Sequence, residues 1–452
     1  MSSGKKQGIS RRDFIKSSAI VAGGTAMLPW LGSCKSVPNQ LMTRSFGRLN
    51  HQVTTFGLGG QASLQWTPSD VDPVAIILKA FQKGVNYFDT SNMYGPSQSN
   101  YGKAFQKLNL IPGEAGYNKE LRKSIFLTTK THVRWAKGGL DVEGINNWTD
   151  GPEGSHTVDD LKRSLSLLFG DGNGNYPEGA YLDMVLIHDV SSQADVDAVY
   201  EGLYDTDPNA ERIGALAALR DYRDGTNLTG LNPGKEKRIR HIGFSGHYDP
   251  AMMIQMIQRD RDNLLEGMLV SINPNDKLYF NMQHNVIPVA AAKNMGIIAM
   301  KVFADGAMYS KEPKWSSEPV DVVRTVGSQQ LPFEPLIQYS LTTPGIHTAI
   351  IGIGEISDDP KKCQLTQNIR AAQVNPGDLS PAKRKEIEKM TSPVKNGKTN
   401  YFQQEDHGLT APRNPRIMVK QTGGEKQVVL EWDMAFAGDE PLDYYEIIRN
   451  DE

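Results

Sequence analysis

The sequence has few cysteines, no long apolar run and almost no charge imbalance, and each of these absences excludes a class of protein. Two cysteines in 452 residues, Cys34 and Cys363, are too few for a disulfide framework or for an iron–sulfur cluster held by cysteines alone. The 49 basic and 52 acidic residues give a net charge of -3, and no long basic run follows the N-terminal segment, so nucleic acid is not an expected partner. No metal site is predicted.

The bulk composition is that of a globular protein. Hydrophobic residues make up 38% of the chain and charged residues 22%. A chain of this length and composition can bury one large core and a smaller second unit.

The N-terminal segment has the features of an export signal. In "SRRDFIKSSAIVAGGTAMLPWLGSC", the pair Arg11 and Arg12 precedes a weakly apolar stretch from Ala19 to Leu31, which is shorter than the roughly 20 residues of a membrane-spanning helix. The segment resembles a bacterial twin-arginine signal, and "LGSC" is similar to a lipobox whose cysteine becomes a lipidated N-terminus. We therefore predict a signal over 1–34 and a periplasmic or membrane-anchored protein that contacts the membrane only through a lipidated Cys34. The alternative is a basic tail followed by a chance apolar helix.

Short apolar runs alternate with amphipathic segments from about residue 42 to 395. Eight runs are candidate strands: "TTFGLGG", "VNYFDT", "IFLTTK", "DMVLIHD", "RHIGFSG", "GMLVSI", "IIAMK" and "HTAIIG". Segments with helical period, such as "DPVAIILKAFQKG", lie between most of them. This alternation predicts an α/β fold with a parallel sheet, and eight units predict a closed (β/α)8 TIM barrel over 42–395.

A doubly wound open sheet is the alternative fold. The stretch "GLGGQA", from Gly57 to Ala62, satisfies a loose dinucleotide-binding fingerprint. That fingerprint requires a helix to begin in the loop, whereas two prolines follow and no helical period starts before Val74. The fingerprint therefore carries little weight.

Three ionisable side chains end consecutive candidate strands. Asp89 ends the second strand, Lys130 the third and His188 the fourth, and Tyr94 lies just beyond the second. Taken singly, each has an ordinary explanation, such as a helix cap, a packed loop aromatic or a surface lysine. In a barrel, however, these strand ends meet at the face where catalysis takes place.

Together the four residues suit hydride transfer to or from a carbonyl carbon, which needs a proton donor beside the oxygen. Tyr94 is the expected proton donor, and a neighbouring Lys130 ammonium would make its phenol a stronger acid. Asp89 would keep that lysine charged and oriented. His188 would fix the oxygen in place.

The motifs around these residues resemble those of the aldo-keto reductase superfamily. The strings "GVNYFDTSNMYG", "NYGKAF", "IFLTTK", "YLDMVLIH", "RHIGFSGH" and "NIRAAQ" occur in the family's order over roughly residues 44 to 375. The resemblance implies a nicotinamide cofactor lying extended across the barrel top and a catalytic tetrad of Asp89, Tyr94, Lys130 and His188.

The resemblance also implies a set of cofactor-binding residues. They are Gly59, Gly60, Asp89, Ser245, Gly246, Ser271, Met300, Lys301, Gly352, Gly354, Gln367 and Asn368. Three positions depart from the usual pattern. Gly246 replaces an asparagine that grips the carboxamide, so that contact is missing or comes from elsewhere, with His247 as a candidate. The usual glutamine corresponds to Ser271 or Asn273, and Met300 replaces a tyrosine that stacks on the nicotinamide, although a plain core role for Met300 is equally open.

Near the eighth strand, the sequence favours NAD over NADP. The family usually places Arg or Lys there to hold the adenosine 2′-phosphate, whereas "IIGIGEIS" offers Glu355. An acidic side chain would repel a phosphate and accept a ribose hydroxyl. Lys361 and Lys362 lie near enough in sequence to leave NADP open.

A second unit is predicted over 411–452. Its residues alternate as in strands, with a tryptophan on the second strand and paired tyrosines on the third. It resembles the first part of a fibronectin type III sandwich, so we expect a partial β-sandwich-like segment after the barrel.

We predict an exported NAD(P)-dependent oxidoreductase acting on a small carbonyl, alcohol or sugar-like substrate. Trp66, Trp135 and Trp148 could stack on sugar faces. Two alternatives remain: a glycan-binding lipoprotein that reuses a catalytically impaired barrel, and a redox-neutral sugar-modifying enzyme with tightly bound NAD.

Overall fold

The computed structural model describes residues 41–145, 147–402, 408–422 and 425–448. Arg11, Arg12, Cys34 and the rest of the predicted signal lie outside the described residues. Within the described ranges, none of the helices has the length and apolar character needed to cross a membrane.

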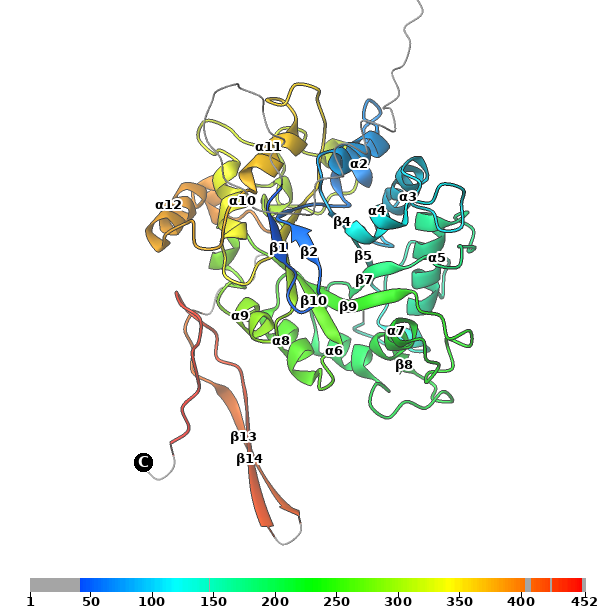
Figure 1. The fold of residues 1–452 in the computed structure, drawn as a ribbon. Coiled ribbons are helices and arrows are strands. Elements are labelled where there is room, and N and C mark those ends of the chain that lie inside the picture. Colours follow the sequence, from blue (N-terminus) through cyan, green and yellow to red (C-terminus); the bar gives the residue numbers. More distant parts are fainter. Residues whose placement is uncertain (1–40, 146, 403–407, 423–424, 449–452) are drawn as a thin grey trace, which may run out of the picture.

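Eight parallel strands close into a barrel, which confirms the predicted TIM barrel and makes the alternative of an open doubly wound sheet wrong (Figure 1). The barrel strands are β3 (Phe56–Leu58), β4 (Tyr87–Asp89), β5 (Phe126–Thr131), β7 (Leu182–Ile187), β9 (Ile239–Gly246), β10 (Leu265–Ser271), β11 (Gly296–Met300) and β12 (Thr348–Ile351). The last strand pairs with the first, with Ala349 opposite Phe56 and Ile351 opposite Leu58. All eight strands coincide with the eight apolar runs of the sequence.

Helices surround the barrel, and most of them bury an apolar stripe on the side that faces the rest of the fold. They are α2 (Pro73–Gln82), α3 (Ser97–Lys107), α4 (Lys119–Ser124), α5 (Thr157–Phe169), α6 (Gln193–Tyr200), α7 (Ala215–Asp224), α8 (Pro250–Arg259), α9 (Val286–Ala292), α10 (Glu334–Leu341), α11 (Gln364–Ala371) and α12 (Pro381–Thr391). Helix α2 is typical: Asp72 caps it by accepting hydrogen bonds from the Val74 and Ala75 amides, and Ile76 and Ile77 are fully buried.

A short N-terminal hairpin closes the bottom of the barrel. It consists of β1 (Thr43–Ser45) and β2 (Gln52–Thr54), which pair antiparallel. Phe46 from its turn is fully buried and meets the rings of Tyr87 and Phe126 edge-on, at centroid distances of 5.7 and 5.1 Å. Because apolar side chains fill this end, polar chemistry is left to the opposite end of the strands.

The C-terminal segment forms a two-stranded ribbon that extends away from the barrel (Figure 1). It pairs β13 (Arg413–Thr422) with β14 (Glu425–Asp433) in antiparallel register. The tyrosine-bearing stretch predicted as a third strand is not a strand over 434–448. Instead, the Tyr445 ring packs on Trp432 at 5.3 Å and its hydroxyl accepts a hydrogen bond from the Ala435 amide. The fibronectin type III resemblance therefore stays a prediction.

Two shorter antiparallel strands lie outside the barrel. They are β6 (Trp135–Lys137) and β8 (Ile213–Gly214), which pair with each other and bring the loops after β5 and β7 together.

Candidate active site

A cleft opens at the carboxyl ends of the barrel strands. Its floor comes from the ends of β3, β4, β11 and β12. Much of its wall comes from the loop after β11, which includes Phe303, Asp305 and Val323. Sequence patterns do not single out this loop, because it carries no catalytic motif and no regular apolar period.

Asp89 and Lys130 form a buried ion pair beneath the cleft. Lys130 Nζ donates to Asp89 Oδ2 at 2.8 Å and to the Thr90 carbonyl at 2.8 Å, and both charged side chains are almost fully buried. Burial raises the pKa of Asp89 and lowers that of Lys130, while the attraction between them opposes both shifts. Neighbouring strands of the parallel sheet place the two residues side by side, since β4 pairs with β5.

Tyr94 lies over this ion pair and lines the cleft. Lys130 Nζ is 4.5 Å from the centroid of the Tyr94 ring. Burial, with Asp89 next in importance, raises the pKa of Tyr94 well above its ordinary value. The phenol therefore keeps its proton at neutral pH, and an acidifying effect of Lys130 on Tyr94 stays a prediction.

The loop that carries Tyr94 is held by Asp160 of α5. The Asp160 carboxylate accepts from Asn92 Nδ2 at 2.5 Å and from Thr131 Oγ1 at 2.9 Å. Arg163, one turn further along the helix, donates to the Asn92 carbonyl at 2.6 Å. These contacts from α5 hold the short loop between β4 and α3 in one conformation.

His188 follows β7 and faces Tyr94. The two rings meet edge-on at a centroid distance of 5.9 Å. Burial, followed by the Lys130 charge, lowers the pKa of His188 well below its ordinary value. The imidazole is therefore neutral at neutral pH. It can donate one hydrogen bond and does not compete with Tyr94 as the proton donor.

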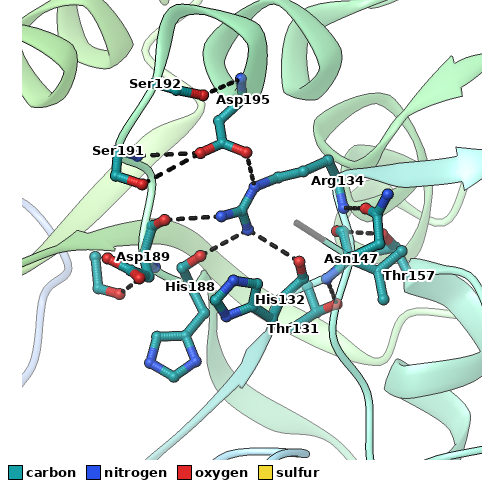
Figure 2. Close-up of polar contacts among 12 residues, drawn as sticks. Thr131, His132, Arg134, Asn147, Thr157, His188, Asp189, Ser191, Ser192 and Asp195 are labelled. Atoms are coloured by element: carbon teal, nitrogen blue, oxygen red, sulfur yellow. Dashed lines mark hydrogen bonds and ion pairs between the residues drawn. The ribbon is translucent and has the colours of Figure 1, made fainter. Parts of the chain in front are cut away.

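A buried arginine fixes the backbone at His188 (Figure 2). Arg134 donates from Nη1 to the His188 carbonyl at 2.6 Å, from Nη2 to the Asp189 carbonyl at 2.7 Å, and from Nε to Asp195 Oδ1 at 2.8 Å. The Asp195 carboxylate also accepts from the Ser191 amide. Sequence patterns could not reveal this role, because the acceptors are main-chain oxygens more than fifty positions away.

The predicted cofactor-binding residues fall into three groups. Those lining the cleft are Gly59, Gly60, Asp89, Met300, Lys301 and Gly352. Ser271 lines a smaller recess beside the cleft. Ser245, Gly246, Gly354, Gln367 and Asn368 are not among the residues that line either cavity.

Some residues in the last group have structural partners of their own. Ser245 Oγ accepts from the Asp189 amide at 2.9 Å, and the Gly354 amide donates to Gln364 Oε1 at 2.8 Å. Gln367 Nε2 donates to the Lys361 carbonyl. Asn368 is fully buried, and neither its amide oxygen nor its nitrogen bonds to another described residue.

The glycines at the end of β3 are required by backbone packing as well. A Cβ at Gly60 would lie 2.4 Å from the Asp89 carbonyl oxygen, and one at Gly59 would lie 2.9 Å from the Gly352 amide nitrogen. Any side chain here would push apart the first, second and eighth barrel strands. The absence of side chains also leaves main chain bare at the cleft floor.

Aromatic and charged residues complete the cleft mouth. Trp66 and His247 line the cleft. Trp148 is 59% exposed, whereas Trp135 is 2% exposed and packed inside, so the suggestion that Trp135 stacks on a sugar is wrong. Among the described residues, no group of three histidine, cysteine, aspartate or glutamate side chains has the arrangement of a metal site.

Comparison with known proteins gives a consistent set of matches. The model of the aldo/keto reductase family matches residues 55–321. The uncharacterized oxidoreductase YqkF of Bacillus subtilis is 21% identical over 346 residues, which cover 73% of this chain and 90% of that protein.

Two solved structures also match. The holo form of aldo-keto reductase AKR11C1 from Bacillus halodurans is 19% identical, covers 78% of this chain and 96% of its own, and has a TM-score of 0.47. An aldo/keto reductase from Klebsiella pneumoniae, in complex with NADP and acetate, is 17% identical, with 78% and 96% of the two chains covered and a TM-score of 0.46.

Proposed function

Because this chain belongs to the aldo/keto reductase family, we propose that it transfers hydride between a nicotinamide cofactor and a small carbonyl or alcohol substrate. The observation that carries the proposal is Tyr94, a protonated phenol that lines the cleft directly above the buried Lys130–Asp89 pair. A binding scaffold has no use for a buried ion pair under a cleft-lining phenol, whereas proton transfer to a developing oxyanion needs a fixed donor.

The residues around the cleft fit such a cofactor. Met300 presents an apolar side chain that can cover a flat ring, and the Lys301 ammonium lies at the same cleft. Gly59 and Gly60 leave main chain accessible at the cleft floor. When bound, the cofactor supplies or accepts the two electrons and the hydrogen of hydride transfer.

The chain's own residues handle the proton and the oxygen. Tyr94 gives its proton to the carbonyl oxygen as negative charge develops there, and takes a proton from the alcohol in the reverse direction. Neutral His188 donates a hydrogen bond to the same oxygen. Lys130 lies against the Tyr94 ring and stabilises the phenolate left after transfer, and Asp89 holds that lysine in place.

We expect NAD rather than NADP. Glu355 favours a ribose hydroxyl over a phosphate at that point. Its carboxylate lies 3.5 Å from Arg324 Nε, so the arginine partly balances its charge. A 2′-phosphate could also approach this arginine. The mass of the cofactor released from purified, denatured protein distinguishes the two forms.

We extend the proposal to a hydroxylated, sugar-like substrate met outside the cytoplasm. The support is the twin-arginine and lipobox pattern of 1–34, together with Trp66 in the cleft and Trp315 in the smaller recess beside it. An exported enzyme would carry its cofactor with it, because the twin-arginine route is associated with proteins that are already folded and loaded with cofactor.

Replacing Tyr94 with phenylalanine tests the central proposal. Tyr94→Phe keeps the ring against Lys130 but removes the proton, so we expect turnover of propanal to fall by about 10²- to 10⁴-fold while cofactor still binds. Aldehyde-dependent consumption of NADH and NADPH measures turnover, and mass spectrometry of the denatured protein measures bound cofactor.

Tyr101→Phe is the matched control. Tyr101 is fully buried, and its hydroxyl bonds to no other described residue, so the variant should keep full turnover. A Tyr94→Phe protein as active as the wild type would overturn the proposal. A wild-type protein that binds neither cofactor would favour the glycan-binding alternative.

A further inference from the structure

His247 is a buried imidazole that the proposed chemistry does not use. It directly follows β9, it is 4% exposed, and neither ring nitrogen forms a hydrogen bond with another described residue. Buried polar groups are nearly always hydrogen-bonded, so two unpaired nitrogens on one ring require an explanation. Burial lowers the pKa of His247 to about 3, and the ring is therefore neutral, with one nitrogen a donor and the other an acceptor.

The position of His247 connects two cavities. It lines both the main cleft and the smaller recess beside it. Its ring centroid is 6.0 Å from that of His188, which holds the reacting oxygen in the proposed function. On the other side, Phe402 lies at 5.8 Å and Trp315 at 6.3 Å. His247 is thus the polar group one step beyond the reacting centre, with aromatic faces behind it.

Asp189 lies beside His247 on a constrained stretch of backbone. Its Oδ1 atom is 4.0 Å from His247 Nε2, beyond hydrogen-bond distance, and has no hydrogen-bond partner among the described residues. The backbone around it is constrained, since the amide bonds to Ser245 Oγ and the carbonyl to Arg134. Asp189 also has a left-handed φ of 53°, a conformation that a non-glycine residue adopts at a cost. The fold therefore holds the Asp189 main chain in a conformation that places its carboxylate beside the imidazole.

We propose that His247, positioned by Asp189, binds a hydroxyl group on the carbon next to the reacting carbonyl. A hydroxyl needs one donor and one acceptor, and a neutral imidazole beside a carboxylate provides both. Two imidazoles whose centroids are 6.0 Å apart can each reach one of two oxygens on neighbouring carbons. The substrate class is α-hydroxy carbonyl compounds and the matching vicinal diols, the unit from which sugars are built.

The inference rests on the proposed function, because the first of the two oxygens is the one held by Tyr94 and His188. It differs from a cofactor role for His247, in which the ring would replace the missing asparagine and grip the carboxamide. A carboxamide contact would affect every substrate equally. A substrate-hydroxyl contact would affect only substrates that carry the hydroxyl.

Three aldehydes of equal chain length separate these cases. They are 2-hydroxypropanal, 3-hydroxypropanal and propanal, assayed at saturating cofactor with the wild-type protein, His247→Phe and His247→Gln. We expect the wild type to prefer 2-hydroxypropanal in kcat/KM, because a site built to bind a hydroxyl discriminates against analogues that lack it. His247→Phe should reduce that preference roughly 10- to 100-fold, mainly through KM, and His247→Gln should restore part of it.

The outcomes distinguish the inference from the proposed function. If His247→Phe lowers kcat/KM equally for all three aldehydes, or raises the cofactor's KM, the ring serves the cofactor and the inference is wrong. If the hydroxyl at carbon 3 is favoured as strongly as that at carbon 2, the assigned position is wrong. If the wild type reduces none of the aldehydes and Tyr94→Phe changes nothing, the proposed function fails and the inference falls with it.

Discussion

At the scale of single residues, the side chains that the sequence could place are those at strand ends. Asp89, Lys130 and His188 end strands that are neighbours in the barrel, so topology alone brings them to one edge. Tyr94 was placed by its short distance in sequence from Asp89. The direction of its pKa could not be predicted, because that depends on how completely the surrounding loops exclude water.

Arg134 illustrates what pattern reading misses. It is fully buried, its partner Asp195 is buried too, and the remaining hydrogen bonds of its guanidinium go to main-chain carbonyl oxygens (Figure 2). Carbonyl oxygens belong to every residue, so the sequence carries no mark of which ones a guanidinium will reach. Only the packed structure shows that this arginine positions His188.

We predict that Arg134→Met destabilises the protein by roughly 3–5 kcal/mol, because it leaves the Asp195 carboxylate buried without its partner. Turnover per folded molecule should also fall, since the His188 backbone loses its support. Urea unfolding measures the first effect, and kcat at a temperature where both proteins are folded measures the second.

Arg122→Met is the matched control for this prediction. Arg122 forms a similarly buried ion pair with Asp183 at 2.7 Å, near the opposite end of β7. It should lose less stability than Arg134→Met, because Asp183 keeps its ion pair with Arg240 at 3.2 Å, and it should keep its kcat. Equal losses of kcat in both variants would mean that Arg134 has only a structural role.

At the scale of elements, the strands were predictable and the loops were not. The loop after β11 forms much of the cleft wall, and it is held from outside by Lys395, whose Nζ donates to the carbonyls of Ala307 at 2.9 Å, Tyr309 at 3.2 Å and Lys311 at 2.8 Å. These contacts span more than eighty positions. A loop fixed in this way has no local signature, whereas a strand shows its apolar run directly.

The loop after β10 carries a buried carboxyl group that should make stability depend on pH. Asp276 is 3% exposed; its Oδ1 accepts from Asn400 Nδ2 at 2.9 Å, and its Oδ2 has no described partner. Burial raises its pKa from 3.8 to about 7. Because the folded state holds this proton more tightly than the unfolded state, the stabilising contribution is complete below about pH 4 and is lost as pH rises toward 7.

We therefore predict that Asp276→Asn reduces the loss of stability between pH 5 and pH 8 by roughly 3 kcal/mol, at about 1.4 kcal/mol per pH unit up to the folded pKa. The free energy of unfolding in urea at the two pH values gives the comparison. Asp262→Asn, at an exposed position, should follow the wild type. An unchanged pH dependence in Asp276→Asn would show that this carboxyl stays ionised when folded.

At the scale of the whole molecule, the barrel could be predicted because eight units of strand and helix have few other ways to bury their apolar faces. The C-terminal segment was harder. Its two paired strands were predicted correctly, but the predicted third strand does not form over 434–448. The alternation of residues does not show whether a strand will find a partner to pair with. The exposed apolar side chains of the ribbon, such as Ile417 and Val419 at 71% and 64%, follow from this incomplete sheet.

Export of the whole chain is tested at its N-terminus. We predict that replacing Arg11 and Arg12 together with lysine leaves the protein in the cytoplasmic fraction with its turnover unchanged, because the predicted catalytic barrel spans 42–395. Cell fractionation followed by the aldehyde assay measures both. Replacing Lys5 and Lys6 with glutamine removes charge outside the arginine pair and should leave export intact. If all three proteins fractionate alike, 1–34 is not a twin-arginine signal.

Closure of the barrel has a consequence for the newly made chain. The pairing of β12 with β3 brings Thr348 next to Thr55, 293 positions earlier, and until then the sheet keeps two open edges. All four tetrad residues have left the ribosome long before this pairing can form. A nascent chain is therefore inactive and open to wrong strand pairing for most of its synthesis, so chaperones that shield strand edges should determine its yield.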